Sequence, residues 1–330
     1  MMKPNVRNFV RSAAAAALAG VVALSAGHAS AADKVSLRLA WLLNVQGAGY
    51  VMAKEKGFYA DAGLDVDILP GGPNINSTAL VATGANTFGT NDSGQVIFGK
   101  AEGMDLVIVA ACFQKYPGGV LSLEKTGIKT PKDLEGKTLA YNEGGPWAFT
   151  QAMLAKEGVD MSKVKAVVAM GNEILMNGNV DAKTAFIVNE PISVELAGFK
   201  TATLAPADYG VNAYAEAIFT AKDFAEKNPD VVKRFVAATV KGWDYALAHQ
   251  DEAVAAVLKL GEQLDPEQQK RQLALQKDFI VSPFTEKNGT CAFSGDTIKE
   301  TQEVLLKYGG LKAPIAIDEV YSTAFLPKKD

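Results

Sequence analysis

The chain has 330 residues, of which 48% are hydrophobic and 21% are charged, and its formal net charge is −4. This composition is globular, and the length is sufficient for two packed cores. The acidic balance disfavours nucleic acid and anionic lipid headgroups as partners.

The first 31 residues are predicted to be an export signal. Lys3, Arg7 and Arg11 form a basic start, and residues 12–27 form an uncharged Ala/Leu/Val run. Ala29-Ser30-Ala31 then gives the small-x-small pattern that precedes cleavage. Cleavage after about Ala31 would leave 299 residues with a net charge of −7.

The rest of the sequence predicts a soluble protein without membrane insertion. We find no later apolar run of the roughly 18 residues that a spanning helix requires. No cysteine lies near the predicted cleavage site, so a lipid anchor there is not expected. We therefore expect a monomer in the periplasm of a diderm bacterium.

Short apolar runs alternate with helical patterns in the first part of the chain. The predicted strands cover 35–41, 64–69, 106–112, 120–123, 138–141 and 164–168. The predicted helices between them cover 47–54, 77–83, 93–101 and 147–156. This alternation predicts an α/β fold with mixed, mostly parallel sheets flanked by helices.

From Asn228 onward the pattern becomes helical. The predicted helices cover 229–248, 252–260, 266–280 and 294–308. An α/β part followed by a helical C-terminal segment fits two lobes between which the chain crosses more than once. We expect crossings near 116–120 and 217–220, where apolar segments meet turn signals.

The two cysteines, Cys112 and Cys291, are predicted to be buried thiols. Cys112 ends an apolar run that reads as a central strand. Export permits a disulfide between them, but two cysteines alone fix no geometry. That bridge remains the alternative.

The sequence contains little that indicates catalysis. One of its two histidines, His28, lies in the predicted signal, and His249 ends an Ala-rich helix, where it is expected to be solvated. We find no zinc-ligand spacing, no G-x-S-x-G, no P-loop and no G-x-G-x-x-G. We therefore expect no enzyme activity, no metal and no cofactor.

Polar and aromatic residues follow successive predicted strands. In open α/β sheets, ligands bind at the carboxyl ends of strands, so these residues are candidate ligand contacts. Taken singly, the polar ones could be turn formers or helix caps, and the tryptophans could pack between lobes. The candidates are Trp41, Asn44, Asn74, Asn91, Asp92, Phe113, Gln114, Tyr116, Asn142, Glu143, Gly144, Gly145, Trp147, Asn189 and Glu190.

Several short motifs, in their order and spacing, resemble one protein family. They are Val35-Ser36-Leu37-Arg38-Leu39-Ala40-Trp41, Ala53-Lys54-Glu55-Lys56-Gly57-Phe58-Tyr59, Gly63-Leu64-Asp65-Val66, residues 131–137, residues 178–182, Asn189-Glu190-Pro191 and residues 324–327. The chain resembles the periplasmic solute-binding proteins of ABC importers over nearly its whole mature length. The branch it resembles includes nitrate, alkanesulfonate, taurine and thiamine-pyrimidine-precursor binders.

The resemblance implies a type II periplasmic binding protein fold. Residues 33–119 and 217–330 would form the first lobe, and residues 120–216 the second, with a hinged ligand cleft between them. An ABC permease in the inner membrane would be the partner. The family also contains a fungal pyrimidine synthase with a Cys-rich motif and a reactive His, neither of which this chain has, so that activity is not implied.

The candidate contacts favour a neutral or cationic heterocycle. Nitrate and sulfonate binders must hold an anion, yet the strand ends carry Asp92, Glu143 and Glu190, with Lys115 as the only cation. Aromatic candidates could stack on a ring, and the carboxylates could accept its N–H groups. We expect a pyrimidine, thiamine-precursor or related vitamin-like ligand. The alternatives are a taurine-, alkanesulfonate- or nitrate-type ligand, or a sensory protein serving a chemoreceptor.

Overall fold

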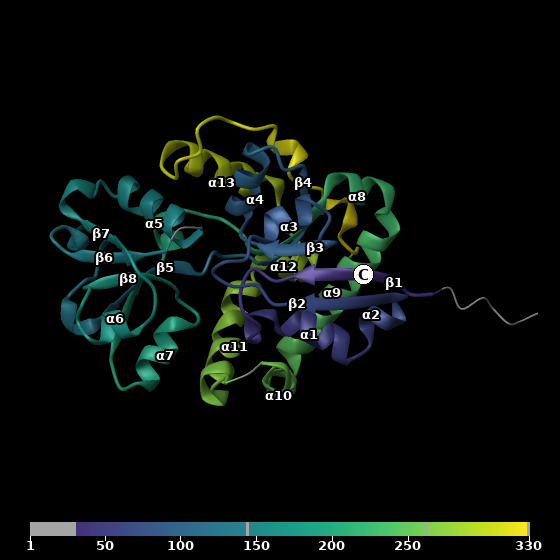
Figure 1. Ribbon diagram of the computed structural model, residues 1–330, viewed down its shortest axis with the longest axis horizontal. Helices are drawn as coiled ribbons and strands as arrows, with labels where there is room; N and C mark the ends of the chain where they lie inside the picture. The colour runs from purple at the N-terminus through teal and green to yellow at the C-terminus, as the bar shows by residue number, and fades with distance from the viewer. Residues whose placement is uncertain (1–30, 143–144, 262, 329–330) are drawn as a thin grey trace, which may run out of the picture.

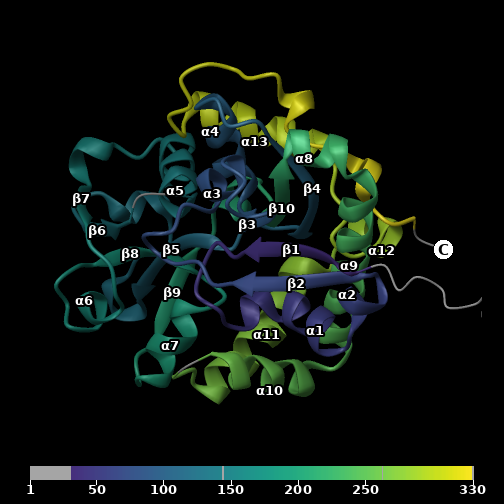
Figure 2. The ribbon, with the colours of Figure 1, turned by 45° about the vertical axis from the view of Figure 1, so that its right-hand side comes forward.

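The computed structural model describes residues 31–142, 145–261 and 263–328 (Figure 1). The predicted export signal, apart from Ala31, lies outside the described residues. Two five-stranded sheets lie side by side, and the helices surround them (Figures 1 and 2). None of the described helices is both long and apolar enough to cross a membrane.

The first sheet has the strand order β2-β1-β3-β10-β4. Its strands are β1 (Asp33–Arg38), β2 (Leu64–Leu69), β3 (Phe88–Asn91), β4 (Leu106–Phe113) and β10 (Ala215–Ala221). β1 pairs in parallel with β2 and β3, whereas β10 runs antiparallel to both β3 and β4. The amino end of β10 therefore lies beside the carboxyl ends of its neighbours.

The second sheet has the order β7-β6-β8-β5-β9. Its strands are β5 (Gly118–Leu123), β6 (Thr138–Tyr141), β7 (Lys165–Val168), β8 (Ala182–Phe186) and β9 (Thr201–Leu204). β6 pairs in parallel with β7 and β8, and β5 runs antiparallel to β8 and β9. The prediction of an α/β fold with mixed sheets is confirmed.

The chain passes between the sheets after β4 and again after β9. The first passage lies at 114–117, close to the predicted 116–120. The second differs from the prediction, because residues 217–220 lie inside β10 and pair with β3 and β4. The chain returns upstream, within 205–214, where Gly210 adopts a left-handed φ of 69°.

The helices of the first part are short, and several begin at polar caps. Asn76 caps α3 and Asp92 caps α4 through their side-chain oxygens. The elements are η1 (Val45–Gly47), α1 (Ala48–Glu55), α2 (Phe58–Asp61), α3 (Ser77–Ala82), α4 (Ser93–Ala101), η2 (Glu124–Thr126), η3 (Pro131–Leu134), α5 (Gly145–Lys156), η4 (Met161–Lys163), α6 (Glu173–Met176), α7 (Glu190–Leu196) and η5 (Pro206–Tyr209).

The C-terminal part is helical, as predicted, and packs mainly around the first sheet (Figure 2). Its elements are α8 (Lys222–Lys227), α9 (Pro229–Ala248), α10 (Gln250–Leu260), α11 (Pro266–Ile280), α12 (Pro283–Asn288), α13 (Gly295–Lys307), η6 (Ile317–Glu319) and η7 (Thr323–Phe325). α9 lies close against α1 because Gly49 and Gly242 have no side chains: a Cβ on Gly242 would come within 2.2 Å of the Gly49 carbonyl oxygen.

The largest hydrophobic core extends from the first sheet into the second. Tyr116, on the first passage between the sheets, packs its ring 4.5 Å from that of Phe149 on α5. Phe149 also packs against Gly94 of α4, where a Cβ would come within 2.7 Å of its ring. On this side the two halves of the molecule are joined by apolar contact.

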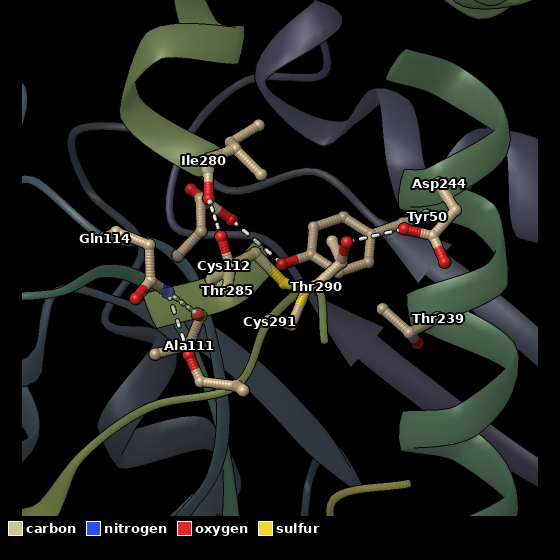
Figure 3. The surroundings of a disulfide bond; sticks show 12 residues. Tyr50, Ala111, Cys112, Gln114, Thr239, Asp244, Ile280, Thr285, Thr290 and Cys291 are labelled. Atoms are coloured by element: carbon tan, nitrogen blue, oxygen red, sulfur yellow. Dashed lines mark hydrogen bonds between the residues drawn. A yellow bond between two sulfur atoms is a disulfide. The ribbon is translucent and has the colours of Figure 1, made fainter. Parts of the chain in front are cut away.

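The two cysteines form a disulfide, so the prediction of two buried thiols is wrong. The sulfurs of Cys112 and Cys291 are 2.09 Å apart, and both residues are fully buried (Figure 3). The segment after α12 lies along β4, where Ala111 N donates to Cys291 O at 2.9 Å. This pairing brings together residues 179 positions apart. Local sequence carries no signal for such a contact.

Candidate functional site

A cavity of about 450 Å³ lies between the two sheets. It is bordered by residues at or after the carboxyl ends of β1, β2, β3, β4, β6 and β8 and by the first residues of β10. Its lining is Ala40, Trp41, Gln46, Gly72, Pro73, Asn74, Ile75, Asn76, Asn91, Asp92, Gln95, Tyr116, Asn142, Pro146, Ala185, Phe186, Asn189, Glu190, Ala215 and Glu216. This volume is within the range of small-molecule sites.

Many of the predicted contacts meet at this cavity. They come from both sheets and from strands far apart in the sequence, because the carboxyl ends of the parallel strands face one another across the cleft. The predicted residues that line the cavity are Trp41, Asn74, Asn91, Asp92, Tyr116, Asn142, Asn189 and Glu190.

Three predicted contacts near the first sheet lie elsewhere. Asn44 is buried and caps η1, where its Oδ1 accepts from Gln46 N at 2.7 Å. Phe113 is fully buried, with its ring edge-on to that of Trp243 at 6.0 Å. The Nε2 of Gln114 donates to the carbonyl oxygens of Ala111 and Ala292, both at 2.9 Å (Figure 3). Phe113 therefore packs in the core, whereas Asn44 and Gln114 hydrogen-bond to the backbone.

Of the other contacts predicted after β6, Trp147 and Gly145 lie within the described residues. Trp147 stacks on Tyr141 with ring centroids 4.0 Å apart and does not line the cavity. Gly145 is the first residue of α5. Glu143 and Gly144 lie outside the described residues.

Glu216 and Gln46 also line the cavity, although neither was predicted from the sequence. Glu216 is the second residue of β10, is buried, and has an unusual left-handed φ of 46°. Its Oε1 accepts from Gln46 Nε2 at 2.7 Å and its Oε2 from Tyr50 Oη at 3.2 Å. Burial raises the pKa of this carboxyl. Glu216 lies beside the cavity because β10 runs antiparallel to its neighbours, which brings the start of this strand to the cleft. The periodicity of the sequence does not reveal the direction of a strand.

Asp92 combines two roles that the sequence left as alternatives. It is the N-cap of α4, where its Oδ1 accepts from Gln95 N at 2.8 Å. It also lines the cavity, and its burial raises its pKa to about 7. The carboxyl therefore changes its protonation near neutral pH, despite the hydrogen bonds that favour its ionised form.

Glu190 belongs to a small polar cluster on the second sheet. Its Oε2 accepts from Phe186 N at 3.0 Å, and its Oε1 lies 3.8 Å from Lys183 Nζ. Lys183 Nζ also donates to Asn172 Oδ1 at 3.1 Å. Burial raises the pKa of Glu190 and lowers that of Lys183. These contacts with Phe186 and Lys183 hold the carboxyl group of Glu190 in place at the cavity.

The lining is polar and acidic rather than cationic. It includes three buried or half-buried carboxyl groups, and among the described residues no Lys, Arg or His lines it. The described part of the chain also contains no cluster of three His, Cys, Asp or Glu residues that could hold a metal ion. His249 lies apart from the cavity and stacks on Tyr245. The site is suited to binding a small polar molecule.

A sequence model of the family described as NMT1/THI5 like matches residues 44–253. The chain belongs to the NMT1/THI5-like family. Riboflavin-binding protein RibY of Chloroflexus aurantiacus is 25% identical over 308 residues, which cover 89% of this chain and 86% of that protein. The formylaminopyrimidine-binding protein of Halalkalibacterium halodurans is 25% identical over 317 residues, 91% and 92% of the two chains.

Other NMT1/THI5-like relatives are named as enzymes. The 4-amino-5-hydroxymethyl-2-methylpyrimidine phosphate synthase of Candida albicans is 26% identical over 236 residues, 66% of this chain and 70% of that protein. The family name alone therefore does not separate binding from catalysis. The relatives named as binding proteins, which match more of this chain, support a substrate-binding role.

The fold is that of the periplasmic binding proteins. The periplasmic aliphatic sulphonate binding protein SsuA of Escherichia coli superposes with a TM-score of 0.68 at 17% identity, covering 90% of this chain and 95% of that one. The resemblance and the fold class inferred from sequence are both confirmed.

Proposed function

We propose that this NMT1/THI5-like protein is an exported binding protein that captures a small nitrogen heterocycle and delivers it to an ABC permease in the inner membrane. The ligand would be a pyrimidine, a thiamine precursor or a related vitamin-like compound such as a flavin. The names of RibY and of the formylaminopyrimidine-binding protein support this class. The protein would act as a monomer and release its ligand unchanged.

The observation that carries the proposal is that the cavity lining contains carboxyl groups and, among the described residues, no cationic side chain. Asp92, Glu190 and Glu216 border the cavity, and no cation among the described residues does so. A nitrate or sulfonate group would have to be desolvated beside these carboxyls without a charged partner. A neutral or cationic ring meets no such penalty.

We assign ligand contact to the predicted residues that line the cavity. Half-buried Trp41 offers an aromatic face, whose stacking on a ring contributes about 0.5–1.5 kcal/mol. Asn74, Asn91 and Asn142 offer amide groups. Together they suit a flat ligand with polar edges.

Lobe movement and export complete the proposal. The first lobe would contain the first sheet and the C-terminal helices, and the second lobe the second sheet, with hinges at 114–117 and within 205–214. Such a pair of lobes closes on a ligand by hinge motion. We further propose cleavage after about Ala31 and residence in the periplasm, consistent with the fold shared with SsuA.

A thermal-shift panel on the purified mature protein tests the proposal. A ligand that binds only the folded state raises the melting temperature by mass action. We expect a rise with riboflavin or with 4-amino-5-hydroxymethyl-2-methylpyrimidine, and none with taurine or nitrate. Mass spectrometry of the recovered ligand should find it unchanged. A response to taurine alone would refute the heterocycle, and chemical turnover would refute the binding role.

A further inference from the structure

One helix, α11, contacts both walls of the cavity. We call the side formed by elements of the first sheet the first wall, and the side formed by elements of the second sheet the second wall. On the first wall, Gln269 Oε1 accepts from Val45 N at 3.0 Å and Gln276 Nε2 donates to Val45 O at 3.1 Å. Val45 begins η1, which also carries the cavity residue Gln46. Both glutamines are buried. α11 therefore fixes the position of this part of the first wall.

The same helix reaches across to α7 of the second wall. Gln268 Nε2 donates to Asn189 Oδ1 at 2.7 Å, and Arg271 forms an ion pair with Glu195. Asn189 precedes α7 and lines the cavity, as does the next residue, Glu190. In both ribbon views α11 lies between the first sheet and α7 (Figures 1 and 2).

The contact with Gln268 determines which end of the Asn189 amide is available. An asparagine amide offers one acceptor oxygen and one donor NH2 group. Because Oδ1 is bonded to Gln268, the group left for the cavity is the NH2. Among the described residues none bonds this Nδ2, and it is not one of the enclosed polar atoms that lack a partner.

A second amide on this wall is arranged in the same way. Asn142 Oδ1 accepts from Thr184 Oγ1 at 3.4 Å, which leaves its NH2 group for the cavity. The carboxylate of Glu190, by contrast, accepts from Phe186 N and faces Lys183. The two amides of this wall therefore leave N–H donors free, beside the carboxyl group of Glu190.

We propose that Gln268 is a positioning residue that orients the amide of Asn189 across the cleft and so makes this wall specific for a hydrogen-bond acceptor on the ligand. The acceptor would be a carbonyl oxygen or an unprotonated ring nitrogen, as on the dione edge of an oxo-substituted heterocycle. This inference rests on the proposed binding function. It adds a residue outside the cavity to the determinants of ligand choice.

Substitution of Gln268 distinguishes two roles for its hydrogen bond with Asn189. The bond could orient the Asn189 amide toward the ligand, or it could only hold α11 and α7 together. In Gln268→Glu the new carboxylate can only accept, so Asn189 must turn its NH2 toward it and its oxygen toward the cavity. In Gln268→Ala the amide loses its partner but can still offer its NH2. Orientation therefore predicts weaker binding in Gln268→Glu than in Gln268→Ala, whereas simple bridging predicts the reverse because the hydrogen bond survives in Gln268→Glu.

We would measure riboflavin binding by quenching of its fluorescence. We expect Gln268→Glu to raise Kd about tenfold and Gln268→Ala to raise it less. Lys270→Gln is the matched control, because Lys270 lies on the same helix but pairs with Asp251 at the surface. Its Kd should stay within about twofold of wild type. Binding by Gln268→Glu as tight as that of wild type, or tighter than that of Gln268→Ala, overturns the inference.

A ligand-free measurement keeps this inference distinct from the proposed function. In 15N-labelled protein, the Asn189 side-chain amide signal is identified by its absence in Asn189→Asp. We expect its hydrogen exchange to be slower in Gln268→Glu than in wild type, because only there is the NH2 bonded. Unchanged exchange refutes the orientation whether or not riboflavin binds. Failure of wild type to bind any heterocycle refutes only the proposed function.

Discussion

At the scale of single residues, burial changes the chemistry of a common cap. Asp92 accepts the hydrogen bond expected of an N-cap, yet its surroundings raise its pKa to about 7. Its ordinary value is near 3.9 in an unfolded chain. The stability associated with its protonated form is therefore present below about pH 4 and is lost as the pH rises toward 7.

Replacing Asp92 by Asn tests this directly. Asn retains the cap but cannot ionise, so the free energy of unfolding should fall less between pH 4 and pH 7 than in wild type, the difference being at most a few kcal/mol. Urea unfolding at several pH values measures it. Asp133→Asn should have the opposite pH dependence, because backbone hydrogen bonds from Lys129 and Thr130 lower the pKa of the exposed Asp133. It should remove a stabilisation that is present above about pH 4 and lost at lower pH. Equal slopes in wild type and Asp92→Asn would contradict the prediction.

Two tryptophans distinguish ligand contact from packing. Trp41 lines the cavity, whereas Trp147 stacks on Tyr141 away from it. Trp41→Ala should weaken binding of the heterocycle about tenfold, because the ring face is lost, with little change in melting temperature. Trp147→Ala should lower the melting temperature and leave Kd nearly unchanged. Calorimetric titration and thermal melting measure the two effects, and equal losses of affinity would contradict the assignment.

The sequence predicted several of the cavity residues that lie at the carboxyl ends of strands. Asn91 ends β3, Asp92 follows it, and Glu190 follows β8, so their position at the cleft could be inferred from the alternation of strands and helices. Phe113 could not be excluded, because only the packing of α9 places Trp243 against it. Glu216 could not be found, because β10 enters its sheet antiparallel.

At the scale of elements, helix bounds were the most predictable feature. The predicted ranges 229–248 and 266–280 coincide with α9 and α11, since each begins with Pro. The buried face of α9 is mostly apolar, whereas that of α11 includes Gln269, Gln272 and Gln276. The pairing of β4 with the segment after α12 was not predictable. It joins elements far apart in the chain, and it is what brings Cys112 to Cys291.

The disulfide should contribute strongly to stability. It closes a loop spanning 179 positions, and a cross-link of this length restricts the unfolded chain by about 3–5 kcal/mol. Cys112→Ser combined with Cys291→Ser should lower the free energy of unfolding by that amount in urea. Dithiothreitol should have the same effect on wild type and none on the double variant. Equal stability with and without reductant would contradict the prediction.

At the scale of the whole molecule, the two sides of the cleft differ in chemistry. One side is joined by apolar contacts: the ring of Tyr116 packs on that of Phe149. Phe149 and Leu305 both lie against Gly94. The other is joined by the polar pairs from Gln268 and Arg271 to α7. Water can replace hydrogen bonds at a cost of about 1 kcal/mol each, but it cannot replace apolar packing. We therefore expect the lobes to part on the α11–α7 side.

Removing the polar pairs tests this direction of opening. Gln268→Ala combined with Arg271→Ala should favour the open form, so small-angle scattering should show a larger radius of gyration without ligand. The dissociation rate of riboflavin should rise about tenfold, because two contacts that close the cleft are lost. Lys270→Ala, on the exposed face of the same helix, should change neither quantity. An unchanged radius with an unchanged dissociation rate would mean that the cleft opens elsewhere, by rupture of the apolar side.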